Sequence, residues 1–235
     1  HAIEKKTCRA VPLSTLQRLV KMAGFTYIVA SWRTPTRDTT SEQNIFKALI
    51  ASYIRDGRNI IAIDETGFSS NSLPIRGYGV RGKRLRAVRV HKNRLKVSTV
   101  MAMSSRGPPS WQTVEGSVNG AIFSRFCCSV FEKAPAESVV IMDNIAFHHS
   151  RAVMDEATRH GIHILFTPPY SPECNPVEHY FSTLKHSMRA LLLEESMRGM
   201  TTCAMTGETF CEKVDSLIEW VSCGHPFENY FTARE

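Results

Sequence analysis

Three carboxylates occupy positions from which they could do chemistry together. Asp64 ends the apolar run Asn59-Ile-Ile-Ala-Ile-Asp64, and Asp143 ends a second run, Ser138-Val-Val-Ile-Met-Asp143. Each run is typical of a strand buried on both faces of a sheet. Glu178 lies in the first turn of a predicted helix, because Asn175 is a good N-cap and Pro176 suits the first helical position. Open α/β sheets place their sites at strand ends, so these side chains are expected to meet there.

Such a cluster favours phosphoryl transfer with divalent metal ions. Three uncompensated carboxylates repel one another unless a cation neutralises them. Hard oxygen ligands select Mg²⁺ or Mn²⁺. Two such ions about 4 Å apart would activate a water or a 3′-hydroxyl and stabilise the leaving oxygen of a phosphodiester. We therefore expect Asp64, Asp143 and Glu178 to be metal ligands for chemistry on nucleic acid.

Each carboxylate also has an ordinary structural explanation. Asp143-Asn144 is a common turn after a strand, and residues 64–67 could form a turn or a helix cap. Glu178 follows Asn175 at the spacing of a capping box, in which the glutamate accepts a hydrogen bond from the N-cap amide. Local chemistry alone leaves these alternatives open.

Composition and charge describe a globular protein with a polyanionic partner. The chain has 235 residues, 43% hydrophobic and 22% charged, with a net charge of +7 and a pI near 9.1. No apolar stretch approaches the ~20 residues of a membrane span, and the basic N-terminus lacks the apolar block of a secretory signal. We expect an intracellular fragment with no membrane partner, in the nucleus of a eukaryote or the cytoplasm and nucleoid of a bacterium. Seven cysteines without a C-x-x-C pair argue against a disulfide framework and a zinc ribbon.

The positive charge is concentrated between Arg76 and Lys96. Nine of the 29 lysines and arginines lie in this segment, which holds no acidic residue. A charge run is often only a solvated surface, but this enrichment favours contact with phosphates. Strand patterns at 83–90 and 95–103 flank the turn-like segment 91–93 and predict a basic antiparallel hairpin.

The remaining pattern alternates helices with strands. Apolar spacing and capping residues predict helices at 12–24, 41–55, 122–134, 150–161, 175–193 and 208–221. A third strand is expected at 162–167, and 104–120 is interpreted as a loop rich in Gly, Pro and Ser. Residues 32–37 predict an extended basic linker, because proline disfavours helix in the residue before it. We expect an α/β fold in which helices flank a mixed sheet, with a helical N-terminal region and a helical C-terminal tail.

Four segments resemble the signature blocks of the mariner superfamily of transposases, including its bacterial insertion-sequence relatives. They occur in the family's order: IAIDETGF (61–68), GYGVRGKR (77–84), MDNIAFHHS (142–150) and ILFTPPYSPECNPVEHYFSTLK (164–185). The resemblance implies a ribonuclease-H-like domain in which Asp64, Asp143 and Glu178 are catalytic and bind two Mg²⁺ or Mn²⁺ ions. One branch of the family has 34 residues between the last two members of its triad, as this chain has. Phe181 replaces a usual tryptophan and Cys174 a usual aliphatic residue, and both keep an apolar side chain.

The resemblance, taken together with the distribution of basic residues, suggests accessory residues, domains and DNA contacts. Asn144 and His148 are possible accessory residues, although His148 could equally be a hydrogen-bonded structural residue. Residues 14–24 are similar to the end of the family's second helix-turn-helix, with an ordinary surface helix as the alternative. The expected domains are residues 1–40, with that helix and the basic linker, 41–200, the ribonuclease-H-like domain, and 201–235, the helical tail. The residues expected to contact DNA are Arg18, Arg33, Arg37, Arg76, Arg81, Lys83, Arg84, Arg86 and Lys185.

The function implied by the resemblance is cut-and-paste DNA transposition. A homodimer would hydrolyse double-stranded DNA at the terminal inverted repeats, and the freed 3′-hydroxyl would attack target DNA. One alternative is a domesticated or inactive transposase-derived protein that binds DNA without cutting it. Another is a ribonuclease or Holliday-junction nuclease of the same fold, which would cleave without joining ends.

Overall fold

The computed structural model of the chain describes residues 12–24, 40–72, 94–197, 205–224 and 231. The chain divides into two compact units, residues 1–37 and residues 38–235. The described part of the first unit is the helix α2 (Leu13–Met22), whose C-cap is Ala23. Gly24 follows in a left-handed conformation, with φ of +82°. The helix predicted at 12–24 and its glycine stop are confirmed.

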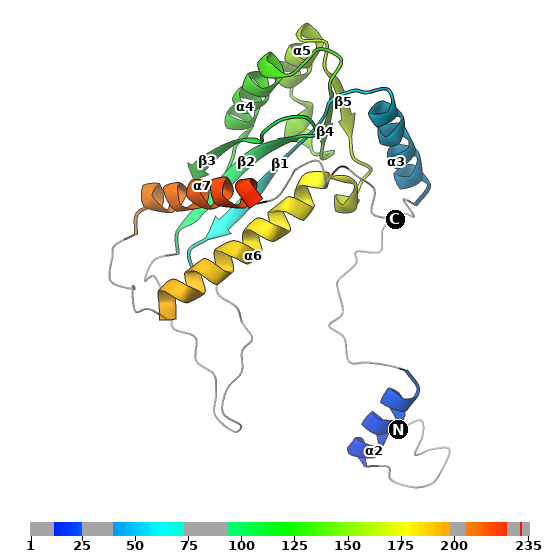
Figure 1. Ribbon diagram of the computed structural model, residues 1–235, viewed down its shortest axis with the longest axis vertical. Coiled ribbons are helices and arrows are strands. Elements are labelled where there is room, and N and C mark those ends of the chain that lie inside the picture. The colour runs from blue at the N-terminus through cyan, green and yellow to red at the C-terminus, as the bar shows by residue number, and fades with distance from the viewer. Residues whose placement is uncertain (1–11, 25–39, 73–93, 198–204, 225–230, 232–235) are drawn as a thin grey trace. The chain divides into compact units, whose positions relative to one another are not determined.

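A five-stranded mixed sheet forms the centre of the second unit (Figure 1). Its strands are β1 (Ile60–Ser69), β2 (Lys96–Ser104), β3 (Ser110–Glu115), β4 (Val139–Met142) and β5 (His163–Phe166). They lie in the order β3-β2-β1-β4-β5. β1 pairs antiparallel with β2 and parallel with β4, so the antiparallel and parallel halves of the sheet meet at this central strand.

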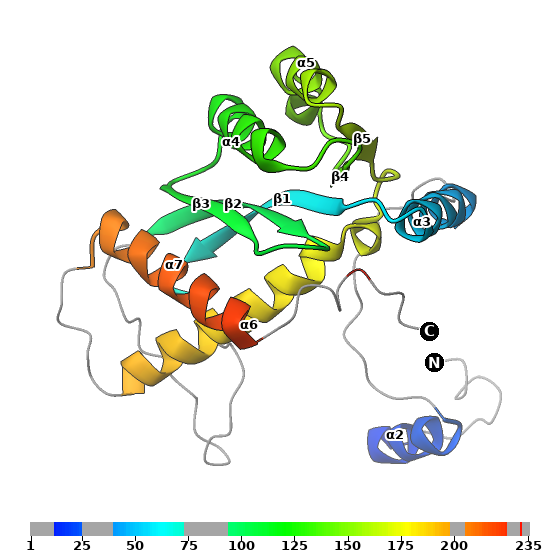
Figure 2. The same cartoon turned by 45° about the horizontal axis from the view of Figure 1, so that its top comes forward.

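Helices cover both faces of this sheet (Figure 2). The face with α4 (Gly120–Lys133) and α5 (Arg151–Arg159) lies opposite the face with α6 (Pro176–Met197) and α7 (Gly207–Gly224). α3 (Thr40–Arg55) precedes β1, and two short 3-10 turns, η1 (Ala146–His149) and η2 (Pro172–Cys174), follow β4 and β5. The mixed sheet, the flanking helices and the helical tail were all predicted and are confirmed. Within the described part of the chain, no helix combines the length and the apolar character needed to cross a bilayer.

Alternate residues of the two central strands point to opposite faces of the sheet. The even-numbered apolar residues of β1 lie in the core beside α6 and α7, and the odd-numbered ones lie in the core beside α4 and α5. In β4 the odd-numbered residues are the ones on the α6 side. Because both faces are covered, these strands have continuous apolar sequences. The same alternation directs Asp64 and Asp143 toward α6.

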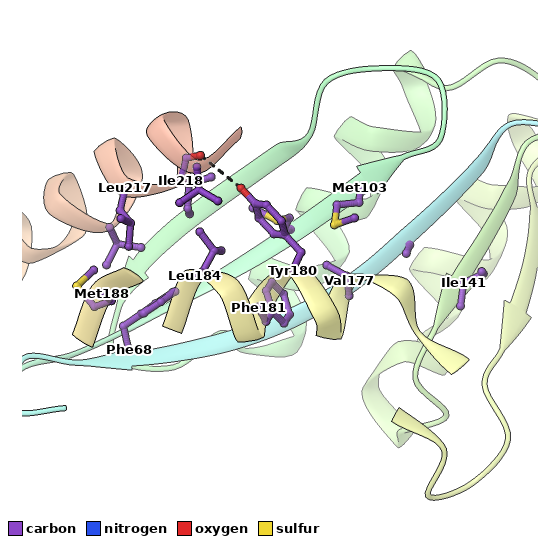
Figure 3. Packing of buried hydrophobic residues seen from close by; sticks show 14 of the residues in the cluster. Phe68, Met103, Ile141, Val177, Tyr180, Phe181, Leu184, Met188, Leu217 and Ile218 are labelled. Atoms are coloured by element: carbon purple, nitrogen blue, oxygen red, sulfur yellow. Dashed lines mark hydrogen bonds between the residues drawn. The ribbon is translucent and has the colours of Figure 1, made fainter. Parts of the chain in front are cut away.

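One stripe of α6 anchors this helix to the sheet (Figure 3). Its buried residues recur every three or four positions and pack against β1 and α7: they are Val177, Tyr180, Phe181, Leu184, Met188 and Leu192. The Tyr180 hydroxyl lies 2.9 Å from Oγ of Ser222 on α7. This packing fixes the direction in which the first turn of α6 approaches the sheet.

The C-terminal helix α7 belongs to the same compact unit as the sheet. Its Asp215 accepts hydrogen bonds from the Trp111 indole at 3.0 Å and from the Thr113 hydroxyl at 2.5 Å, both on β3. Lys213 forms an ion pair with Glu195 of α6 at 2.5 Å. These contacts attach α7 to the antiparallel edge of the sheet and to α6.

Two predictions about strands are wrong. β1 does not end at Asp64 but continues through Ser69, because residues 61–69 pair with β2. The segment 104–120 is not all loop, since it contains β3, which pairs with β2 from Ala102↔Ser110 to Val97↔Glu115. The strand predicted at 95–103 is confirmed as β2, with β1 and β3 as its partners. The other half of the predicted hairpin, residues 83–90, lies outside the described residues.

Candidate active site

Asp64 lies on β1 where the strand leaves its parallel neighbour. The pairing of β1 with β4 ends at Ala62↔Ile141, so Asp64 and Asp143 each stand two residues beyond the last pair. Asp64 is only 6% exposed. Its Oδ1 accepts a hydrogen bond from the Glu65 amide at 2.7 Å, which leaves Oδ2 directed toward α6.

Asp143 follows β4 directly and is half-buried. Its Oδ1 accepts a hydrogen bond from the Thr167 hydroxyl at 3.3 Å. Thr167 is itself held by its own amide, which donates to the Met142 carbonyl at 2.9 Å. The end of β5 therefore helps to orient the Asp143 carboxylate.

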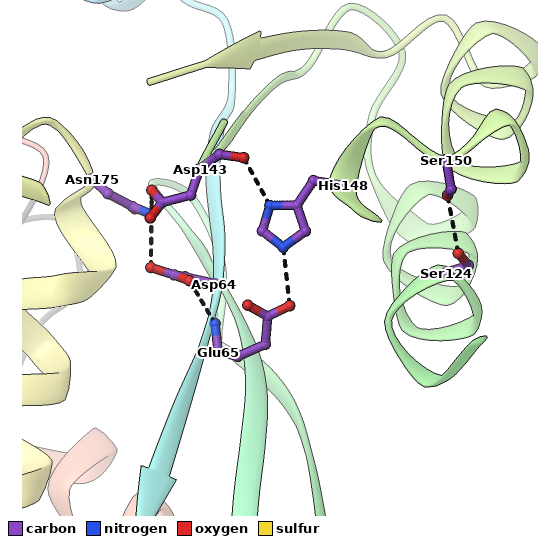
Figure 4. A network of polar contacts seen from close by, with 7 residues as sticks. All are labelled: Asp64, Glu65, Ser124, Asp143, His148, Ser150 and Asn175. Atoms are coloured by element: carbon purple, nitrogen blue, oxygen red, sulfur yellow. Dashed lines mark hydrogen bonds and ion pairs between the residues drawn. The ribbon is translucent and has the colours of Figure 1, made fainter. Parts of the chain in front are cut away.

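Asn175 joins the two aspartates (Figure 4). Its side-chain Nδ2 donates to Oδ2 of Asp64 at 3.2 Å and to Oδ1 of Asp143 at 3.3 Å, and the residue is fully buried. Its Oδ1 accepts from the Val177 amide at 3.4 Å in the first turn of α6. We call the contacts of Nδ2 with the two carboxylates the Asn175 bridge. The sequence predicted Asn175 as an N-cap, which is confirmed, but not the bridge.

Glu178 lies in that same first turn of α6 and is half-buried. The capping-box alternative is not observed, because the Asn175 amide donates to the Pro172 carbonyl at 3.0 Å. Among the described residues, no group of three or more His, Cys, Asp or Glu side chains is arranged to hold a metal ion. The structure thus joins Asp64 to Asp143 and leaves Glu178 nearby without closing a three-carboxylate cage.

Burial and neighbouring negative charge both disfavour the ionised form of Asp64. Burial, followed by repulsion from Asp143, raises the pKa of Asp64 from 3.8 to about 8. The hydrogen bond from the Glu65 amide opposes this rise, while the charges of Glu65 and Glu178 add to it. Glu178 is therefore close enough for its charge to act on Asp64. At neutral pH and without a cation, the site favours the protonated form of Asp64.

His148 lies behind the aspartates, on the side of α4 (Figure 4). It has no exposed surface, and its ring stacks on Phe123 with centroids 4.1 Å apart. Its Nδ1 is 2.8 Å from the Asp143 carbonyl oxygen, and its Nε2 is 3.1 Å from Oε1 of Glu65. The sequence singled out His148 but gave no reason to expect Glu65 as its partner.

The other predicted site residues are less central. Asn144 is exposed, and its Oδ1 lies 2.8 Å from Nε2 of the exposed His149. Two of the predicted DNA contacts are described: Arg18 is exposed on α2, and Lys185 is partly exposed on α6. The remaining predicted DNA contacts lie outside the described residues: Arg33, Arg37, Arg76, Arg81, Lys83, Arg84 and Arg86.

Comparisons with known proteins bear on this site and on the fold. A sequence model of the family described as DDE superfamily endonuclease matches residues 59–197, a stretch that contains all three carboxylates. A search of curated protein sequences found no match.

Solved structures of the Mos1 transposase have the same fold as this chain. The pre-cleavage Mos1 transpososome is 15% identical, with a TM-score of 0.60 over 100% of this chain and 78% of that one. The Mos1 paired-end complex with Mg is 17% identical, with a TM-score of 0.61 and the same two coverages. The Mos1 strand transfer complex is also 17% identical, with a TM-score of 0.59 over 100% and 77%. The predicted ribonuclease-H-like fold is confirmed.

Proposed function

We propose that this chain, which belongs to the DDE superfamily of endonucleases, cuts DNA at transposon ends and joins the freed 3′-hydroxyl to target DNA. The observation that carries the proposal is the convergence of Asp64 and Asp143 on one buried amide, with Glu178 in the adjoining helical turn. Reactions that break and make phosphodiester bonds at such a site need a cation to balance the carboxylates.

The residues present fit a divalent metal ion. The donor atoms are carboxylate oxygens, which Mg²⁺ and Mn²⁺ prefer. The Asn175 side-chain nitrogen already donates to both carboxylates, and burial together with the charge of Asp143 raises the pKa of Asp64, so a cation would favour its ionised form. We propose that Asp64, Asp143 and Glu178 hold Mg²⁺ or Mn²⁺, with two ions expected. The Mos1 paired-end complex with Mg supports this choice of metal.

The chemistry assigned to the chain's own residues follows from their positions. A bound metal ion would activate a water molecule or the 3′-hydroxyl of the cleaved DNA and would stabilise the leaving oxygen. Asp64 must release its proton before it can act as a ligand, because only the carboxylate coordinates. Thr167 orients the Asp143 carboxylate by a hydrogen bond, and before a cation binds Asn175 holds the first turn of α6, with Glu178, against both aspartates.

The partners and domains that we propose follow the family resemblance. Double-stranded DNA, as terminal inverted repeats and as target, would contact Arg18, Lys185 and the other basic residues named above. The Mos1 transposase paired-end complex with the left transposon end supports a DNA substrate. We also propose that the chain forms a homodimer. We propose three domains: a helix-turn-helix remnant in residues 1–40, a catalytic domain in 41–200 and a tail in 201–235. Asn144 is a proposed accessory residue, and location in a nucleus or bacterial nucleoid accords with a DNA substrate.

A plasmid nicking assay with Mg²⁺, followed by a strand-transfer assay with a pre-cut end, tests this function. We expect the wild-type chain to nick and to join, and Asp143→Ala to do neither. Asp155→Ala is the matched control, because Asp155 is an exposed carboxylate on α5. Nicking that survives Asp143→Ala would contradict the assignment. DNA binding without nicking by the wild type would indicate an inactive derivative, and nicking without joining a nuclease.

A further inference from the structure

We propose that Glu65 and His148 form a positioning pair that sets the spacing of Asp64 and Asp143 from the α4 side of the sheet. We call it the Glu65–His148 pair. The inference rests on the proposed function, because it assigns the pair to the metal-binding carboxylates. Neither residue would contact the DNA or the metal ion, so both would act through the aspartates.

The direction of the side chains places this pair opposite the Asn175 bridge. Asp64 and Glu65 are neighbours on β1, so their side chains point to opposite faces of the sheet. Asp64 meets Asn175 on the α6 side, while Glu65 meets His148 on the α4 side (Figure 4). The two aspartates are therefore linked on the α6 side of the sheet through their carboxylates and on the α4 side through the Glu65–His148 pair.

The hydrogen-bond chemistry of His148 fixes its role. A backbone carbonyl can only accept, so Nδ1 must carry a proton and donate to Asp143 at 2.8 Å. The other nitrogen, Nε2, lies 3.1 Å from the Glu65 carboxyl oxygen, so a proton must also lie in that contact. Whichever of the two partners holds that proton, both ring nitrogens are satisfied and the ring cannot flip without losing both bonds.

Burial makes this arrangement rigid. His148 is fully buried, stacked on Phe123 at 4.1 Å and packed edge-on against Phe147 at 4.5 Å. A buried histidine with two satisfied nitrogens is often only structural. Here, however, one partner is the backbone of Asp143 and the other is the residue next to Asp64, so a shift of the ring is passed to either aspartate within one residue. Mutation of a residue that hydrogen-bonds to a metal ligand and orients it typically lowers metal affinity or activity by roughly 10–100-fold.

Isosteric variants can separate the two halves of the pair. In His148→Asn the amide nitrogen takes the place of Nδ1 and retains the bond to Asp143, whereas in His148→Gln it takes the place of Nε2 and retains the bond to Glu65. Glu65→Gln keeps the contact as well, since its amide can donate to a neutral Nε2. Glu65→Ala abolishes it. His160→Gln is the matched control, because His160 contacts Glu156 on α5 at 3.0 Å by the same chemistry.

The readouts are Mn²⁺ affinity by electron paramagnetic resonance, single-turnover cleavage and DNA affinity. We expect both His148 variants and Glu65→Ala to lose roughly 10–100-fold in Mn²⁺ affinity and in cleavage rate, at unchanged DNA affinity. Glu65→Gln should recover to within a few-fold of the wild type, and His160→Gln should match it. Wild-type Mn²⁺ affinity in folded Glu65→Ala and in both His148 variants would overturn the positioning role.

The failure of the proposed function would look different. If the wild type binds Mn²⁺ but does not cut DNA, then transposition is contradicted, while the affinities of the variants still decide the positioning role. Loss of binding in Glu65→Gln equal to that in Glu65→Ala would also count against the pair, because the retained hydrogen bond should rescue it. A wild-type chain that binds no Mn²⁺ would overturn both proposals.

Discussion

The Asn175 bridge and the Glu65–His148 pair connect the same two aspartates in physically different ways. In the bridge, one neutral amide is shared between two carboxylates at 3.2 and 3.3 Å, and it faces the atoms that would meet a cation. In the pair, the buried His148 ring makes a 2.8 Å hydrogen bond to the main-chain carbonyl of Asp143 and a 3.1 Å contact with the Glu65 carboxyl group. We therefore expect metal binding to replace or weaken the Asn175 bridge. We expect the contacts of the Glu65–His148 pair to persist throughout the reaction.

The largest effect should come from changing Asp143 itself. Asp143→Asn leaves the carbonyl that His148 contacts unchanged and alters only the side chain on the Asn175 side. We expect cleavage to fall on the order of 10³-fold, since a charge that supports the transition state is lost. Thermal unfolding without metal should show no loss of stability, because one of the charges that repel Asp64 disappears. Near-wild-type nicking by Asp143→Asn would contradict the distinction drawn between the Asn175 bridge, which involves the carboxylate of Asp143, and the His148 contact, which involves its carbonyl.

A smaller loss of cleavage is expected when the donor of the Asn175 bridge is replaced by an acceptor. Asn175→Asp keeps the shape and the oxygen that caps α6, but it replaces the bridging donor with another carboxylate. Without metal the melting temperature should fall, and Mn²⁺ should restore much of the loss. Cleavage should fall roughly 10–100-fold, as for other residues that orient ligands.

Asn175→Ser is the control for this reversal. The serine hydroxyl can still cap α6 but is too short to bridge, and it adds no charge. Its melting temperature without metal should lie between those of the wild type and Asn175→Asp. If Asn175→Asp were as stable as the wild type in a chelator, repulsion between the carboxylates would not be what the bridge offsets.

The ionisation of Asp64 predicts a pH dependence of stability. Because its pKa rises from 3.8 to about 8 in the folded protein, the unfolded chain loses this proton first. The free energy of unfolding of the metal-free protein should thus decline as pH rises from about 4 to about 8, and this contribution should then level off. In Asp64→Asn the decline should be smaller. Any fixed cost of the amide would not vary with pH, so parallel curves for the two proteins, measured by denaturant unfolding in a chelator, would refute the raised pKa.

The smallest effect is expected behind the pair, at Phe123. Phe123→Leu keeps an apolar residue but removes the ring that stacks on His148, which should cost about 1–2 kcal/mol of stability. Phe131→Leu is the matched control, because Phe131 is equally buried on the same helix. Thermal unfolding should show similar losses for both variants, whereas only Phe123→Leu should slow cleavage, by a few-fold. Equal cleavage rates would separate the stacking from the positioning role.

The sequence predicted best what local pattern and covalent order determine. The apolar runs before Asp64 and Asp143 identified the two central strands, and Asn175-Pro176 marked the start of α6 correctly. The extension of β1 past Asp64 was missed, because residues 65–69 are not a continuous apolar run and are held by pairing with β2. The strand β3 was missed because only its pairing with β2 and the contacts of Asp215 distinguish it from a loop.

The contacts that organise the site could not be read from local spacing. Asn175 and Asp64 are separated by 111 positions, and His148 and Glu65 by 83. Each of these polar residues also had a sufficient local explanation, as a cap, a turn or a buried histidine. Only the folded sheet shows that Asp64 and Glu65 point to opposite faces and so require different partners. Their identification therefore needed the topology as well as the sequence.

The position of a bound Mn²⁺ ion would test the central claim most directly. Anomalous scattering would locate it in crystals of the chain soaked at a pH above about 8, where Asp64 is ionised. We predict a peak contacted by oxygens of both Asp64 and Asp143, with the Asn175 amide displaced, the His148 contacts retained and Glu178 turned toward the ion. A Mn²⁺ peak that neither aspartate contacts would contradict a metal site built from these three carboxylates. The absence of any peak, with Glu178 directed away from the two aspartates, would contradict it as well.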